Sequence, residues 1–220
     1  MSQQGPADKA RRATIPAESA TPWQVIHPAP LLALQPDFLT AAEADSVLHR
    51  LDQEIDWHSP TIQIYGRQHK IPRAQCWMGD DGLAYRYSGH SMYATPWHPG
   101  VEALRDRVIH ALDHANLPFS RFNSVLLNRY RGGEERMGWH SDDEVELGHA
   151  PIVAALSLGS ERPLRFRDRQ RQAFNVWLPH GSLLLMGPGA QSCWQHALAP
   201  RKIAGTRISL TFRRIVSDAA

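Results

Sequence analysis

Residues 207–213 read Arg-Ile-Ser-Leu-Thr-Phe-Arg, and this run decides the fold that we expect for the chain. Its odd-numbered positions are all polar and its even-numbered positions are all apolar. Successive side chains of a β-strand point to opposite faces of a sheet, so the alternation predicts a half-buried strand. Two guanidinium groups and two hydroxyl groups then share one face of that strand.

The polar face of this strand is predicted to hold an anion. A guanidinium group matches a carboxylate with two parallel hydrogen bonds, and two like charges on one strand face are unfavourable without an anion between them. A dicarboxylate would supply that charge. The run 125–130 places Asn128 and Tyr130 on one strand face, where both can donate hydrogen bonds to the same ligand. The alternative is a basic strand edge that faces solvent.

His140-Ser141-Asp142 is the candidate metal motif. On a strand, residues two apart share a face, so this imidazole and this carboxylate can bind one ion together. A second imidazole from His196 would complete one face of an octahedron and leave positions open for oxygen and substrate, the arrangement of non-haem Fe(II) oxygenases. Two alternatives are a chance occurrence in a chain with twelve histidines and a structural zinc site. Zinc would need a fourth protein ligand, for which Cys193 is the nearby candidate.

Taken together, these motifs resemble the AlkB-type Fe(II) and 2-oxoglutarate dioxygenases, which reverse the alkylation of nucleobases, and most resemble the branch that acts on duplex DNA. The similarity extends from about Tyr65 to Ile215. Its most specific stretches are residues 122–133, 138–144, 194–202 and 207–215. The resemblance implies a double-stranded β-helix, or jelly roll, with flanking helices and an N-terminal nucleotide-recognition region.

The resemblance also assigns the metal and cosubstrate residues. The iron ligands, which are also the catalytic residues, are His140, Asp142 and His196. The residues matching the 2-oxoglutarate site are Asn128, Tyr130, Arg207, Ser209, Thr211 and Arg213. Ser209 stands where the better-known bacterial member has an asparagine, and its hydroxyl can still form a hydrogen bond with the cosubstrate.

A second group of residues matches the family's nucleic-acid contacts. Tyr65 beside Gly66 matches the finger aromatic that fills the gap left by a flipped base. Tyr87 matches the aromatic that stacks on that base, opposite the ring of His140. The other residues matched to the base are Tyr85, Glu144 and Arg73, and those matched to DNA contacts are Arg201 and Lys202. Core packing is the alternative for Tyr65 and Tyr85.

Two departures from the duplex-acting pattern leave the choice between single and double strands open. The basic trio after the second iron histidine is here Arg201-Lys202-Ile203, which has one charge fewer. The basic hairpin after the iron motif is shortened to residues 165–171. In the relatives, both loops contact the complementary strand.

The implied activity is oxidative demethylation of 1-methyladenine-type and 3-methylcytosine-type bases in DNA. It uses Fe(II), O2 and 2-oxoglutarate and releases formaldehyde, succinate and CO2. Alternatives are the same chemistry on RNA or on a protein side chain, or a non-catalytic binder of damaged bases. A binder needs neither both histidines nor both arginines, which argues against the last alternative.

Composition agrees with one globular domain, since 220 residues with 42% hydrophobic content can bury a single core. The fold class expected is α+β, mainly β. Residues 1–21 are expected to form a flexible tail, and residues 22–217 one dioxygenase domain. Within that domain, 22–121 would supply substrate recognition and supporting helices, and 122–217 the jelly-roll catalytic core. We expect a capped helix after Thr40, a second helix from near Gly100 to Asn116, and strands at 152–158, 164–167, 174–178, 182–186 and 207–215.

Two cysteines are too few for a disulfide framework, and neither a membrane-length apolar run nor a signal core is present in the sequence. We therefore expect an intracellular protein, cytoplasmic or nuclear, with no membrane partner. The net charge of +2 gives weak support for nucleic acid, and the stronger indication is a cluster of arginines between positions 162 and 171. The oligomeric state stays open, and a monomer would suffice for the site.

Overall fold

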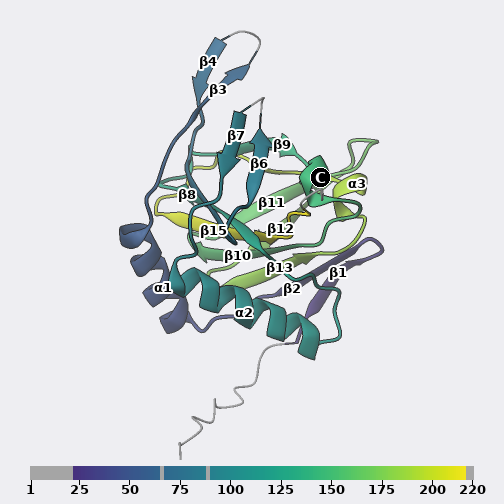
Figure 1. The fold of residues 1–220 in the computed structure, drawn as a ribbon. Coiled ribbons are helices and arrows are strands. Elements are labelled where there is room, and N and C mark those ends of the chain that lie inside the picture. Colours follow the sequence, from purple (N-terminus) through teal and green to yellow (C-terminus); the bar gives the residue numbers. More distant parts are fainter. Residues whose placement is uncertain (1–21, 65–66, 88–89, 217–220) are drawn as a thin grey trace, which may run out of the picture.

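Two β-sheets form the body of the molecule in the computed structural model, which describes residues 22–64, 67–87 and 90–216 (Figure 1). The larger sheet has the strand order β1-β2-β13-β10-β15-β8-β5 and the smaller sheet has the order β12-β11-β14-β9. The strands of the larger sheet are β1 Gln24–Pro28, β2 Leu31–Gln35, β5 Ala74–Gly79, β8 Ser124–Tyr130, β10 Val153–Gly159, β13 Ser182–Met186 and β15 Arg207–Arg213. Those of the smaller sheet are β9 Met137–His140, β11 Arg162–Arg167, β12 Ala173–Leu178 and β14 Gln195–Leu198. The predicted mainly-β jelly roll is confirmed.

The larger sheet separates two apolar layers. On one side it packs on helices α1 (Ala41–Glu54) and α2 (Pro99–His114), and the even-numbered residues of β15 are fully buried in that layer. On the other side a second cluster, which includes Phe166 of β11 and Leu184 of β13, fills the space between the sheets. The odd-numbered residues of β15 therefore face the interior between the two sheets rather than solvent.

β15 lies in the middle of its sheet, hydrogen-bonded to β10 on one side and to β8 on the other. This position rules out the basic strand edge considered above. The register pairs Arg207 with Tyr130 and Ser209 with Asn128 across β8. Directly paired residues of antiparallel strands share a face, so this register brings the cosubstrate candidates of both strands together.

Both predicted helices are present. The hydroxyl of Thr40 accepts the backbone N–H of Glu43 at 3.3 Å, and the Glu43 carboxylate accepts the N–H of Thr40 at 2.9 Å, which is a complete capping box. α2 begins at Pro99, one residue before the predicted start, because proline fits the first turn and His98 provides the cap. It ends at His114, two residues before Asn116.

Three strands of the larger sheet, β1, β2 and β5, come from before residue 122, so the sheet is not confined to the 122–217 segment. The strands β1, β2 and β5 were not predicted. The signal that could have located β2 is the apolar run 31–34 between two prolines, because β2 is a buried strand whose side chains are apolar on both faces.

Two hairpins stand at one end of the molecule (Figure 1): β3 (Thr61–Ile64) with β4 (Arg67–Lys70), and β6 (Ala84–Tyr87) with β7 (His90–Tyr93). Two short helical turns, η1 (Val145–Leu147) and α3 (Ala190–Cys193), complete the elements. In the described part of the chain, no helix is long and apolar enough to cross a membrane. The tail predicted for 1–21 lies outside the described residues.

Candidate metal and cosubstrate site

His140, Asp142 and His196 meet at one point, where their ligand atoms lie within 4.8 Å of one another. His140 ends β9 and is paired in register with His196 on β14. The two imidazole centroids are 4.2 Å apart. The structure therefore brings together the three residues that the sequence placed in the metal site.

The prediction that His140 and Asp142 lie on one strand is wrong. β9 ends at His140, and Asp142 lies in the segment that follows. The backbone N–H of Asp142 donates to the side-chain oxygen of Gln191 at 3.0 Å, so a side chain replaces the ladder bond that a continuing strand would make. The carboxylate reaches the two histidines because the chain turns, not because a strand alternates.

Both histidines have a nitrogen lone pair available for a metal. His140 Nδ1 lies 2.9 Å from the carbonyl oxygen of Gly138, and because a carbonyl can only accept, Nδ1–H is the donor; in the neutral ring this tautomer carries its lone pair on Nε2. Burial, followed by the charge of His140, lowers the pKa of His196 to about 3. His196 is therefore neutral at physiological pH, and its 3.9 Å separation from Asp142 Oδ2 is a spacing of ligand atoms rather than an ion pair.

Asp142 is a buried carboxylate, only 1% exposed, with its two oxygens in different surroundings. Burial is the largest single influence and raises its pKa, but the charges of Arg213, His196 and His140 together outweigh burial, so the net pKa is lowered. Oδ1 accepts from Arg213 at 2.7 Å. Oδ2 is buried and has no hydrogen-bond partner among the described residues.

These features fit a divalent cation. An ionised carboxylate oxygen without a partner is costly to bury, and a metal ion would satisfy it. Two neutral imidazoles and one carboxylate form the donor set of non-haem iron sites with open positions. Cys193 is exposed and is not part of this cluster, so the described residues offer no fourth protein ligand that would close a structural zinc shell.

A cavity of about 490 Å³, which includes its open mouth, adjoins the three ligands. Six of its lining residues are those that the resemblance assigned to 2-oxoglutarate: Asn128, Tyr130, Arg207, Ser209, Thr211 and Arg213. The remaining wall is largely apolar and includes Leu164, Leu178, Met186 and Leu198. The cavity thus has a cationic, hydrogen-bonding wall and an apolar wall, which suits a small dicarboxylate that is oriented at its ends.

Arg207 is the deepest cation of this cavity. It is 4% exposed, its guanidinium donates to the Ser157 hydroxyl at 2.9 Å, and its charged carbon lies 5.6 Å from the centroid of the Tyr130 ring. Burial lowers its pKa to about 10, so it is still protonated at neutral pH. The hydroxyl of Tyr130 has only a long contact with the Met137 sulfur, at 4.0 Å. Both groups are available to a carboxylate.

The residues assigned to nucleic acid are more dispersed. Nε of Arg73 donates to Asn128 Oδ1 at 2.8 Å, so in this structure Arg73 reaches the cosubstrate side of the site. Oε2 of Glu144 is buried without a hydrogen-bond partner among the described residues. Arg201 is half-buried and Lys202 is exposed. Tyr65 and Gly66 lie outside the described residues, as do the side chains of Tyr85 and Tyr87, whose backbone belongs to β6.

Two residues of the site were not predicted from the sequence. Ser157 binds Arg207, and Gln191 binds the backbone of Asp142. Ser157 has the one polar side chain of β10, so a serine inside an otherwise apolar strand was a usable sequence signal, and the structure pairs it with Ser209. Gln191 had no such signal, because its role depends on contact with a residue that lies 49 positions away.

Residues 32–213 match the family model described as the 2OG-Fe(II) oxygenase superfamily. The chain is 36% identical over 188 residues to the mouse DNA oxidative demethylase ALKBH2, covering 80% of this chain and 76% of that protein. It is 34% identical over 200 residues to the human alpha-ketoglutarate-dependent dioxygenase alkB homolog 3, covering 85% of this chain and 67% of that protein.

Solved structures agree at the level of the fold. A structure of OsALKBH1 superimposes with a TM-score of 0.66 at 19% identity and covers 88% of this chain and 100% of that one. A 2OG-Fe(II) oxygenase family protein from Burkholderia pseudomallei gives a TM-score of 0.57 at 14% identity, covering 83% and 84%. At these identities the likeness concerns the arrangement of the strands alone.

Proposed function

The chain belongs to the 2OG-Fe(II) oxygenase superfamily, and from that membership and the site geometry we propose that it removes alkyl groups from nucleobases of DNA. The resemblance to AlkB-type dioxygenases is confirmed by the relatives. Fe(II), 2-oxoglutarate and O2 are accordingly its cofactor and cosubstrates. The single observation that carries the proposal is that the ligand cluster adjoins a cavity wall with two arginines, in a chain whose relatives include a DNA oxidative demethylase.

The chemistry divides between the bound groups and the protein. Iron, when held by His140, Asp142 and His196, supplies with O2 and 2-oxoglutarate the oxidation that removes an N-methyl group as formaldehyde and yields succinate and CO2. The protein's share is orientation and the exclusion of water. Arg207 and the Tyr130 hydroxyl would bind a carboxylate of 2-oxoglutarate, while the apolar wall of the cavity excludes water from the rest of that ligand.

Glu144 is a candidate for reading the base. Its buried Oε2 needs a donor, and 1-methyladenine and 3-methylcytosine both carry an exocyclic amino group that can donate. Thymine-type bases have a carbonyl oxygen at the corresponding position. A carboxylate here would therefore favour amino-bearing lesions.

The charge distribution supports a nucleic-acid partner. On the helical side, each arginine of α1 and α2 is paired with a carboxylate, at 3.0, 2.8 and 2.8 Å for Arg50, Arg105 and Arg107. Beside the smaller sheet, the described structure shows no ion pair with a carboxylate for five arginines: Arg165, Arg167, Arg169, Arg171 and Arg201. Cations left unpaired on one side of a protein are available to phosphates.

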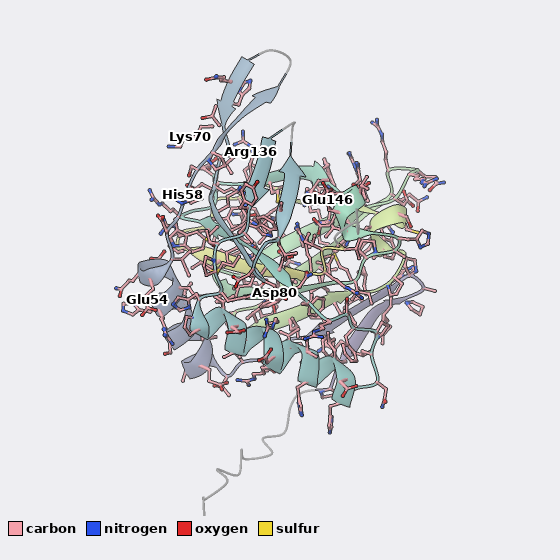
Figure 2. All side chains as sticks on the ribbon, viewed as in Figure 1. Glu54, His58, Lys70, Asp80, Arg136 and Glu146 are labelled. Atoms are coloured by element: carbon pink, nitrogen blue, oxygen red, sulfur yellow. The ribbon has the colours of Figure 1, made fainter. Side chains whose placement is uncertain are left out.

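Tryptophans accompany these cations. The guanidinium carbons of Arg165 and Arg167 lie 5.6 and 4.3 Å from the ring centroid of Trp139, and that of Arg201 lies 5.4 Å from Trp177. Trp139 directly precedes the metal ligand His140. Figure 2 adds Lys70 on the β3–β4 hairpin and Arg136 near its base, where Arg136 N–H donates to the Pro72 carbonyl at 3.0 Å. We infer that a nucleic-acid strand binds along the side of the molecule that carries the smaller sheet and the β3–β4 hairpin. A DNA substrate would place the protein in the cytoplasm or nucleus.

The test is direct. The purified chain is incubated with Fe(II), 2-oxoglutarate and ascorbate on oligonucleotides that carry 1-methyladenine or 3-methylcytosine, as single-stranded DNA, duplex DNA and RNA, and the products are weighed by mass spectrometry. We expect loss of one methylene mass from DNA, absent in His140→Ala and retained in Ser192→Ala, whose exposed hydroxyl bonds only to Gly189. Succinate formation with every methyl group retained would show an active oxygenase whose substrate is a different RNA modification or a protein.

A further inference from the structure

The main chain of Asp142 is held by a side chain from a distant segment. Because β9 has already ended at His140, no strand partner fixes the peptide of Asp142. Its N–H instead donates to Oε1 of Gln191 at 3.0 Å, and the two residues are 1% and 4% exposed. A hydrogen bond in a site this dry is costly to break, because water cannot replace the missing acceptor.

Gln191 is itself fixed at both ends of its amide. Nε2 donates to the sulfur of Met186 on β13 at 3.6 Å, which orients the amide and leaves Oε1 as the acceptor for Asp142. A second bond reinforces the same contact, since the Ser141 hydroxyl donates to the carbonyl of Trp194 at 3.1 Å. The segment 191–194 therefore holds the loop of the His-Ser-Asp motif at two successive residues.

The same segment leads directly into β14, which carries His196. The segment that supplies the ligand His196 thus also holds the backbone of the ligand Asp142. At the other end of the Asp142 side chain, Oδ1 is occupied by Arg213 at 2.7 Å. With the backbone fixed by Gln191 and one oxygen fixed by Arg213, only Oδ2 is left to face the two imidazoles.

We propose that Gln191 is a positioning residue of the metal site, which holds the peptide of Asp142 so that Oδ2 is presented to the ion between His140 and His196. Gln191 is not part of the ligand cluster and does not line the cavity, so its role is to orient Asp142. Metal-ligating side chains depend on the groups that orient them, and loss of such a group typically weakens metal binding by about 10- to 100-fold. This role concerns metal loading, so it holds whichever nucleic acid is the substrate.

The test is a Co(II) titration of the full chain without substrate, followed by calorimetry and by the visible absorption of the bound ion. Gln191→Met keeps the length of the side chain and removes both amide atoms. We expect its Co(II) dissociation constant to rise by about 10- to 100-fold and its absorption bands to shift, because the Asp142 carboxylate is no longer held toward the bound ion. Gln191→Glu keeps an acceptor oxygen for the Asp142 N–H and should retain the wild-type band positions.

Two controls separate positioning from simple damage. Ser192→Ala changes the neighbouring, exposed residue and should leave affinity and spectrum unchanged. Thermal unfolding of each metal-free variant reports stability independently. If Gln191→Met does not fold, Gln191→Asn, which retains the amide but shortens its reach by one methylene, takes its place in the same titration. Wild-type affinity together with a wild-type spectrum in the folded variant would overturn the proposal, whatever its melting temperature. Since no oligonucleotide is present, failure here leaves the demethylation assay unaffected.

Discussion

Arg207 is a buried cation with no carboxylate partner among the described residues. Its Nε is buried without a hydrogen bond, and only Ser157 and the Tyr130 ring support the rest of the group. Burial lowers its pKa to about 10, which means that the folded protein disfavours the charged form of the guanidinium group. The group still remains charged at neutral pH. A protein retains such a group where an anion offsets the cost, as 2-oxoglutarate would here.

The unpaired charge of Arg207 predicts opposite effects of Arg207→Met on stability and on binding. Without ligand, the variant should be as stable as the wild type or more stable by on the order of 1 kcal/mol, because an unpaired buried charge is replaced by an apolar chain of similar length. With Mn(II) present, 2-oxoglutarate at about 100 times its Kd should stabilise the wild type by about 2.7 kcal/mol and the variant not at all.

Thermal unfolding with and without 2-oxoglutarate measures both effects. Arg50→Met, which removes an exposed and ion-paired arginine from α1, is the matched control and should keep the ligand-induced shift. A strongly destabilised Arg207→Met that still responds to 2-oxoglutarate would show that Arg207 is structural.

At the scale of single elements, the start of α1 combines a helix cap with an ion pair. The Glu43 carboxylate accepts from Thr40 and from Arg107 of α2, at 2.9 and 2.8 Å. The hydrogen bond from Arg107 is the main reason that the pKa of Glu43 is lowered to about 2. One side chain thus closes the cap of α1 and links it to α2, and the sequence showed only the first of these roles.

The stability that Glu43 contributes should depend on pH in a defined window. Its folded pKa is below the ordinary value of 4.5, so the contribution is fully present above pH 4.5 and is lost as the pH falls toward 2. Urea unfolding of wild type and Glu43→Gln should differ at pH 6, and the difference should shrink strongly by pH 2.5. Because the side chain is 43% exposed, solvent screening keeps the difference below about 1 kcal/mol.

Thr40→Ala tests the cap separately. It removes the hydroxyl that accepts the Glu43 N–H, so it should cost about 1 kcal/mol at pH 6. The same hydroxyl donates to the Glu43 carboxylate at 3.0 Å, so at pH 2.5 chiefly the part of that cost due to the N–H remains. A gap between wild type and Glu43→Gln that stays constant down to pH 2.5 would exclude ionisation of Glu43 as its source.

The loop between β8 and β9 is locked to the loop after β14. Gly133 N–H donates to the carbonyl of Ile203 at 3.0 Å, and Arg201 N–H donates to the carbonyl of Gly133 at 2.9 Å. Buried Arg162 reinforces this junction with donations to the carbonyls of Glu135 at 2.9 Å and Ala199 at 2.7 Å. The junction sets where Arg201 and Lys202 stand relative to the metal ligands.

Gly133→Ala should therefore be destabilising, while Gly132→Ala should not. A Cβ at Gly133 would overlap the Arg201 carbonyl oxygen and lie 2.8 Å from that of Ile203, whereas a Cβ at Gly132 meets nothing within 4 Å. We expect Gly133→Ala to lower the free energy of unfolding by about 1–3 kcal/mol and to weaken DNA binding, because the loop of Arg201 is displaced. Equal stability of the two variants in urea would contradict the close packing of the β8–β9 loop against the loop after β14.

At the scale of the whole molecule, cations are divided between two sides. The arginines of α1 and α2 form ion pairs with carboxylates, whereas the five arginines named above beside the smaller sheet form none among the described residues. A net charge of +2 conceals this division, because composition counts charges and not their neighbours. Figure 2 shows one such carboxylate, Glu54 on α1, away from the hairpin end that carries Lys70.

The division predicts which arginines determine the salt dependence of DNA binding. Arg165→Gln with Arg169→Gln should weaken affinity and lower the slope of log K against log salt by about one unit for each phosphate that the variant no longer neutralises. Arg50→Gln with Arg107→Gln should leave the slope unchanged. Fluorescence anisotropy with a labelled oligonucleotide between low and physiological salt measures both pairs. Identical slopes for the two double variants would place the DNA elsewhere.

Periodic patterns made both long helices and several strands of the jelly roll predictable. The alternation in 207–213 and the apolar spacing of the two helices follow from local geometry, so β15, α1 and α2 were found close to their observed bounds. β1 and β2 were missed because neither shows alternation, β2 being apolar on both faces. Their place in the sheet depends on β13, which follows about 150 residues later in the chain.

By itself, the sequence determined the donor types of the site: two imidazoles, one carboxylate and a strand face with two arginines, because side-chain chemistry and strand alternation are local properties. Only the tertiary structure decided that Asp142 leaves the strand, that Gln191 and Arg213 hold it, and that Arg73 contacts Asn128. These contacts join residues 49 to 71 positions apart, and no local pattern encodes them. They arise because packing one sheet against the other leaves each buried polar group to find its partner among whatever residues the fold brings near.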